Sequence, residues 1–224
     1  MFRGPFTKCQ ERQSIPMPAS STYKIVPSTG FYPQLNTLLI ALQGVAVAAE
    51  LRVKGAVAHN AGDYLTVQAK HLQEEVRLPL VGPIEAALAN RKPDEVHLTV
   101  VQGTTSSNLA YWTSRFAEFV DAIFLPFLVS YHERYRSEIE AKHSQSRTSW
   151  PAPWQMSWAL RNAASHSGKV FDQATRAPVS WRGFTFGPND EPARTILSLV
   201  NGGDILLLLL EMEVARTGVP LALA

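Results

Sequence analysis

The chain of 224 residues lacks several features that would each point to a particular class of protein. Cys9 is its single cysteine, so the chain cannot form an intramolecular disulfide or a cysteine metal cluster, as is typical of a protein in a reducing cytoplasm. Its 21 basic and 19 acidic residues leave a formal charge of +2, which excludes the strongly basic composition of a nucleic-acid coat protein. Any contact with nucleic acid must therefore be a local patch.

Long hydrophobic runs are also missing. The longest one near the N-terminus, over residues 35–49, is interrupted by Asn36, Gln43 and Gly44 and is too short and too polar to span a bilayer. The first twenty residues lack the continuous apolar centre of a secretion signal. We therefore expect a cytoplasmic protein that makes no membrane contact.

Hydrophobic residues make up 46% of the chain, which is enough for one sizeable core, and no change in composition divides it. Pro16 and Pro18 indicate a flexible lead-in over residues 1–22. We expect a single domain over residues 23–224.

Apolar residues recur every three or four positions through most of this domain, as they do on the buried face of a helix. We leave the state of residues 97–102 open. The continuous apolar run at 205–210 predicts burial in the core or in a subunit interface. The helices predicted in this way span residues 33–52, 63–77, 84–90 and 109–142, with a last one carrying 196–200 and 204–216.

Another helix is predicted at about 153–166, after a tryptophan- and proline-rich entry. Short extended pieces separated by turn residues follow, which predicts a small β-hairpin at about 169–187. The expected fold class is mainly α: a helical bundle with a small β-hairpin inserted after the helix at 153–166.

This helix carries the most informative motif of the chain, Arg161-Asn162-x-x-x-His166. An Arg followed by a His at similar spacing occurs three more times, but only the Arg161 copy has Asn after the Arg. A guanidinium can hold a phosphate by two hydrogen bonds and stabilise charge that develops on it. An imidazole can transfer a proton near neutral pH. Helical geometry places the three side chains on neighbouring strips of one surface.

These residue types suit the cleavage of RNA without a metal ion. The reaction needs a base for the 2′-hydroxyl, an acid for the departing 5′-oxygen and a cation for the transition state. One Arg and one His cannot easily fill all three roles, whereas a two-fold dimer would bring two of each to one cleft.

The segment from Leu160 to Gly168 resembles the signature of the HEPN superfamily, and the following hairpin and Leu-rich last helix are similar to members that carry such an insert. The resemblance implies a HEPN-like helical bundle and a homodimer with a composite cleft. It also implies metal-independent endoribonuclease activity on an RNA substrate in a toxin-antitoxin or defence setting, without cofactor or metal. By the same resemblance, the catalytic residues would be Arg161, Asn162 and His166, and an antitoxin or regulatory protein would be a possible partner.

A second interpretation of the same residues stays open. Arg161 could stack on Trp158 or pair with a carboxylate, while Asn162 and His166 satisfy the helix end. The protein would then be a non-catalytic RNA- or protein-binding dimer. The tryptophans at 150, 154, 158 and 181 could stack RNA bases, but core packing is the expectation for them. The charged stretch at 133–147 is expected on a solvated helix face, and histidines such as His132 in ordinary surface or loop positions.

Overall fold

The computed structural model shows a mixed α/β protein, so the prediction of a mainly α HEPN-like bundle was wrong. A four-stranded antiparallel sheet and a two-stranded hairpin accompany the helices. The structure describes residues 20–54, 64–69, 74–79, 81–102, 114–165, 177–187 and 200–224.

The sheet is built from the first half of the chain. It has the order β1-β4-β3-β2, and its neighbours pair antiparallel, with Ser20 opposite Val101 and Val76 opposite Val100. Its strands are β1 (Ser20–Ile25), β2 (Tyr64–Ala69), β3 (Glu74–Pro79) and β4 (Val96–Gln102). β4 fills the stretch that the sequence had left open, and Ser20 to Thr22 in β1 were expected in the lead-in.

Strands β2 and β3 replace the helix predicted at 63–77. In β2, Leu65, Val67 and Ala69 are buried at every second position, which is the period of a strand. The apolar residues of this short stretch also fit a helical spacing, so periodicity alone could not separate the two states. Pairing of β3 with both β2 and β4 decided the outcome, because cross-strand packing outweighs local preference.

The helices elsewhere agree with the prediction to within a few residues. The hairpin strands β5 (Val179–Trp181) and β6 (Phe184–Phe186) confirm the second half of the hairpin expected at 169–187. Residues 169–176 of that hairpin and 196–199 of the expected last helix lie outside the described residues. The observed helices are α1 (Tyr32–Lys54), α2 (Gly82–Leu88), α3 (Ser114–His143), α4 (Ala152–Ser165) and α5 (Gly202–Thr217), with a 3-10 turn at Arg147–Ser149 before α4.

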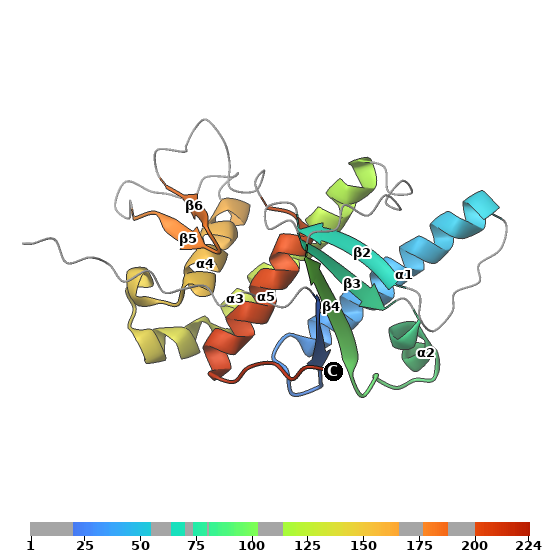
Figure 1. Cartoon of the computed structure of the whole chain (residues 1–224), viewed down its shortest axis with the longest axis horizontal. Helices are drawn as coiled ribbons and strands as arrows, with labels where there is room; N and C mark the ends of the chain where they lie inside the picture. Colours follow the sequence, from blue (N-terminus) through green and yellow to red (C-terminus); the bar gives the residue numbers. More distant parts are fainter. Residues whose placement is uncertain are drawn as a thin grey trace, which may run out of the picture.

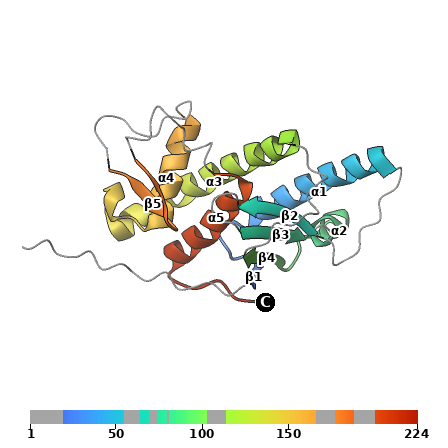
Figure 2. The same ribbon diagram turned by 45° about the horizontal axis from the view of Figure 1, so that its top comes forward.

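The elements divide between two ends of the molecule (Figures 1 and 2). α4 and the β5-β6 hairpin gather at one end, and the four-stranded sheet with α1 and α2 forms the other. α5 lies between them and contacts α3, α4, β2 and β3. None of the described helices combines the length and the apolar character that a membrane crossing requires.

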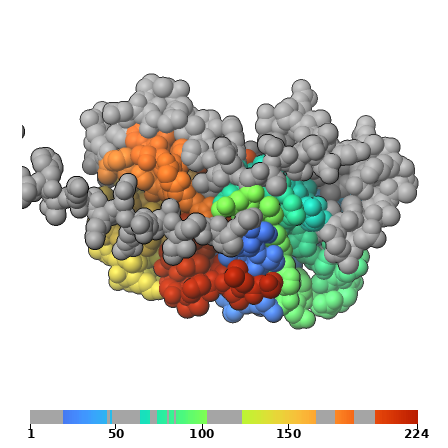
Figure 3. Space-filling view, viewed as in Figure 1, coloured from blue at the N-terminus to red at the C-terminus, as the bar shows by residue number. Residues whose placement is uncertain are grey.

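The C-terminal segment after α5 lies along the outer edge of β1. The amide of Lys24 donates to the Ala222 carbonyl (2.8 Å), and the amide of Ala224 donates to the Thr22 carbonyl (3.0 Å). Figure 3 shows this red segment against the blue residues of β1. It covers a strand edge that would otherwise offer unpaired backbone groups to another chain.

Helix α5 is fixed at both ends and buried along its length. Asn201 and Asp204 form a capping box at its start, and Gly218 ends it in the left-handed conformation (φ 72°). The apolar run at 205–210 lies in the core of this chain, as the sequence suggested, which leaves it unavailable as a subunit interface. The Gly202-Gly203 pair lets the first turn of α5 lie close to the backbone of β2, since a Cβ at 203 would lie 2.3 Å from the Gln68 carbonyl oxygen.

Helices α3 and α4 pack around a buried histidine. His132 is almost fully buried, contrary to the surface position expected for it, and its ring lies against Trp150 and Trp154. Its Nδ1 lies 2.8 Å from Ser157 Oγ, and that hydroxyl donates to the Trp154 carbonyl (3.0 Å). Burial lowers the pKa of His132 to about 4, so the imidazole is neutral at neutral pH.

Gly203→Ala should destabilise the protein by about 1–3 kcal/mol, because the new methyl group meets the backbone of β2, which cannot turn aside as a side chain can. Urea denaturation measures the free energy of unfolding. Gly44→Ala in α1 is the matched control, since nothing lies within 4 Å of its Cβ position, and it should be neutral or slightly stabilising. Equal stability of the two variants would contradict the close contact.

His132 should make the protein less stable in mild acid. Its native pKa of about 4 lies below the usual value of 6.5, so the unfolded chain binds more protons between these pH values, and stability is lost as the pH falls through that window. The loss from this group between pH 7 and pH 5 is about 2 kcal/mol. Nearby charges on Glu133, Arg136, Glu140 and Arg161 modify this value.

The measurement is the free energy of unfolding at pH 7 and pH 5 for the wild type and His132→Gln. The variant should lose less stability over this interval than the wild type. His97→Gln, which removes an exposed imidazole, should behave as the wild type does. An identical pH dependence in His132→Gln would show that the buried imidazole does not carry the effect.

Candidate functional site

The motif predicted from the sequence lies at the end of α4. Arg161 and Asn162 lie in its last described turn, and His166 lies outside the described residues. The helix begins after Pro151, whose carbonyl accepts from the Trp154 amide (2.9 Å), and it was predicted within one residue of its observed bounds. Arg161 and Asn162 are half-exposed on this helix. The residues of its buried side are Trp154, Met156, Ser157, Ala159, Leu160 and Ala163.

Two contacts hold the Arg161 side chain. Its Nε donates to Glu133 Oε1 on α3 (2.5 Å), and its Nη1 donates to Asn162 Oδ1 (3.0 Å). The side chains of Arg161 and Glu133 are 30% and 43% exposed, so solvent reaches both. An exposed ion pair of this kind contributes about 0–1 kcal/mol to stability. Its main consequence is that it orients the guanidinium.

Part of the Arg161 guanidinium has no partner among the described residues. A guanidinium has five N–H groups, and the two contacts with Glu133 and Asn162 use one on Nε and one on Nη1. Within the described residues no further partner is recorded for Nη2. The neighbouring imidazole of His132 is neutral at neutral pH and adds no positive charge beside the Arg161 guanidinium. The arrangement can bind an anion that offers paired oxygens, such as a phosphate.

The structure also tests the expectations for the tryptophans. Trp150, Trp154 and Trp181 are buried, which confirms core packing over base stacking for these three. Trp158 is only partly buried, and the Arg147 guanidinium, not that of Arg161, stacks over its ring at 4.3 Å. Of the two structural roles weighed for Arg161, the carboxylate pair is therefore observed.

The charged stretch before α4 behaves largely as predicted. Arg134, Arg136 and Lys142 are exposed on α3, and Arg136 pairs with Glu140 one turn away (2.7 Å). Arg147 is the exception, because it is buried and its guanidinium stacks on Trp158 of α4. Glu133 was grouped with this solvated face, and nothing in the sequence indicated that it would reach a residue 28 positions later.

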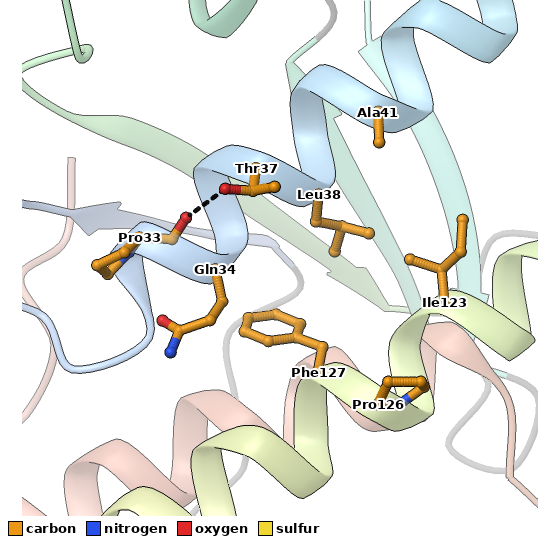
Figure 4. A pocket seen from close by; sticks show the side chains of 8 residues that line it. All are labelled: Pro33, Gln34, Thr37, Leu38, Ala41, Ile123, Pro126 and Phe127. Carbon is orange, nitrogen blue, oxygen red and sulfur yellow. Dashed lines mark hydrogen bonds between the residues drawn. The ribbon is translucent and has the colours of Figure 1, made fainter.

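A separate apolar groove of about 490 Å³ lies between α1 and α3 (Figure 4). Figure 4 shows the amide end of Gln34 turned away from the Phe127 ring, and its Oε1 is buried without a hydrogen-bond partner among the described residues. Uncharged side chains line the groove, so it does not suit a phosphate. The lining residues are Pro33, Gln34, Thr37, Leu38, Ala41, Ile123, Pro126 and Phe127, and none of them belongs to the motif.

Within the described ranges, no three His, Cys, Asp or Glu side chains are grouped as metal ligands would be. At the α4 end the structure places a guanidinium and an amide in contact. Whether His166 joins them remains a prediction from the sequence.

Comparison with known proteins gives no relative. No family model, no curated protein and no solved structure matches this chain. The likeness to the HEPN superfamily thus rests only on the sequence features from residue 160 onwards, and the mixed α/β fold is not the helical bundle which that likeness implied.

Proposed function

We propose that the protein is a metal-independent endoribonuclease and that the end of α4 binds the RNA phosphate to be cleaved. One observation carries the proposal: Arg161 is held by Glu133 and Asn162 at a half-exposed helix end and keeps part of its guanidinium for a ligand. A pre-oriented cation of this kind stabilises charge on a phosphate more than a freely moving side chain does.

The chemistry would be a transesterification. The RNA 2′-oxygen attacks the phosphorus while a base takes its proton, and the P–O5′ bond breaks while an acid protonates the 5′-oxygen. Arg161 would neutralise the phosphate, Asn162 would keep the guanidinium in register, and His166 would transfer the proton. The histidine's role rests on the sequence, four residues after Asn162.

The second His and Arg would come from a second copy of the chain, since one copy supplies only one of each in this motif. We therefore include a homodimer with a composite cleft in the proposal. The core of each chain already buries the Leu-rich run of α5, so the interface would use the surface near α4 instead.

One observation favours a second candidate, a non-catalytic RNA- or protein-binding dimer. Arg161 is paired with the carboxylate of Glu133, and this ion pair connects α4 to α3, which is a structural role. In that case the same surface would bind a partner without breaking a bond. Cleavage separates the two candidates, because only the first needs a group that transfers protons.

Arg161→Ala and His166→Ala should each lower the cleavage rate of purified tRNA in EDTA by at least about 100-fold, because one removes the phosphate cation and the other the proton-transfer group. The matched controls are Arg136→Ala, an exposed arginine paired on α3, and His143→Ala at the end of that helix. Both controls should cleave as the wild type does. Light scattering should show the same dimer for all five proteins.

Wild-type rates in either purified and dimeric site variant would exclude the proposed site. RNA bound by the wild type but left intact, with binding insensitive to His166→Ala, would support the non-catalytic candidate instead.

A further inference from the structure

Arg147 is a buried cation that has no carboxylate partner among the described residues. The residue is 9% exposed, its Nη2 donates to the Ala177 carbonyl (3.0 Å), and its guanidinium stacks on Trp158. Its Nη1 is buried and has no hydrogen-bond partner. Burial lowers the pKa of Arg147, with no nearby charge acting in the opposite direction. A buried N–H group left without a partner is destabilising, and more so when the group is charged.

Two other arginines in the described part of the chain show how this protein normally compensates such burial. Arg182 bonds to Glu74 (2.7 Å) and Glu211 (2.6 Å), and Arg216 bonds to Glu213 (2.8 Å) and Glu138 (3.1 Å). By the exposure of the whole residue, Arg147 is buried, whereas Arg182 and Arg216 are partly buried. Carboxylates raise the pKa of each. Of these three arginines, only Arg147 has no carboxylate among the described residues to compensate its buried charge.

The position of Arg147 indicates which kind of anion would pair with its guanidinium. Trp158, on which it stacks, precedes Arg161 and Asn162 by three and four residues on α4, so the indole lies about one helical turn from them on neighbouring strips of the helix. Arg147 stacks on this indole, so it lies on the side of α4 that carries Arg161. Cations along one surface can hold neighbouring phosphates of one strand, while an indole offers a stacking surface.

We propose that Arg147 is a second phosphate-binding residue, which on Trp158 holds a phosphate neighbouring the one at Arg161 in a single RNA strand. This inference rests on the proposed function of the α4 end. Arg147 binds substrate here and takes no part in the proton transfer. Since protein atoms cover Nη1, an anion must shift the surroundings of Trp158 to reach it, and the emission of the indole should change on binding.

The test measures binding separately from cleavage. A 2′-O-methyl oligonucleotide lacks the attacking hydroxyl, and fluorescence anisotropy gives its dissociation constant at several KCl concentrations. Arg147→Gln should weaken binding about tenfold and reduce the slope of log Kd against log salt by about 0.7, the value for one phosphate contact in a single strand. Arg147→Lys should recover part of the slope, because it keeps the charge.

Arg136→Gln, an exposed and paired arginine, is the matched control and should leave the slope unchanged. An unchanged dissociation constant and slope in folded Arg147→Gln would overturn the inference while leaving the proposed function intact if wild-type protein still cuts unmodified RNA. Absence of wild-type cleavage, with the salt slope still dependent on Arg147, would overturn the nuclease proposal alone.

A second measurement covers the case in which Arg147→Gln does not fold. Inorganic pyrophosphate titrated into the wild-type protein should change its tryptophan emission, and Trp158→Phe should remove that change. No change in the wild type, at concentrations that displace the oligonucleotide, would overturn the inference.

Discussion

The structure depends most on the buried carboxylate of Glu213 in α5. The amide of Gly30 donates to its Oε1 (2.9 Å), Tyr131 of α3 donates to Oε2, and Arg216 contacts both oxygens (2.8 and 3.1 Å). Burial alone would raise the pKa of Glu213, but these donors outweigh it and lower the pKa. One ionised side chain thus joins the turn before α1 to α3 and α5, and removing any donor would leave part of a buried charge without a partner.

The residues next to Glu213 extend the same function to the other end of the molecule. Glu211 accepts from Trp181 Nε1 (2.6 Å) and pairs with Arg182 of the β5-β6 turn, while the Met212 carbonyl accepts from Trp154 Nε1 of α4 (3.0 Å). Three consecutive residues of α5 therefore fix the hairpin, α4 and α3. The site follows from this, because Arg161 on α4 can meet Glu133 on α3 only when those two helices are held in register.

Local sequence signals predicted the helices well and the sheet poorly. Helix α4 could be located because its proline entry and helical spacing are both local, and α1 and α5 because their apolar runs are long. Strands β2 and β3 could not, since Leu65, Ala69 and Val76 fit a helix as well as a strand, and only pairing with the distant β4 decides between them. The residues of a short segment do not indicate which distant strand it will pair with.

In the site, too, only the features that follow from local spacing could be predicted. The sequence indicated that Arg161 and Asn162 share a surface, because that follows from spacing on one helix. It could not indicate the pair with Glu133, the burial of His132, or the stacking of Arg147 on Trp158, since each joins residues that the chain separates and the fold brings together. The family resemblance also rested on local sequence features, and the mainly α architecture that it implied was wrong.

The central claim is that the end of α4 cleaves RNA by attack of the 2′-oxygen without a metal ion. The chemical ends of the products test it most directly: purified protein is incubated with RNA in EDTA, and the new termini are identified by mass spectrometry. The account predicts 2′,3′-cyclic phosphate and 5′-hydroxyl ends. Products with 3′-hydroxyl and 5′-phosphate ends that form only with a divalent metal, or intact RNA after incubation with folded dimer, would contradict it.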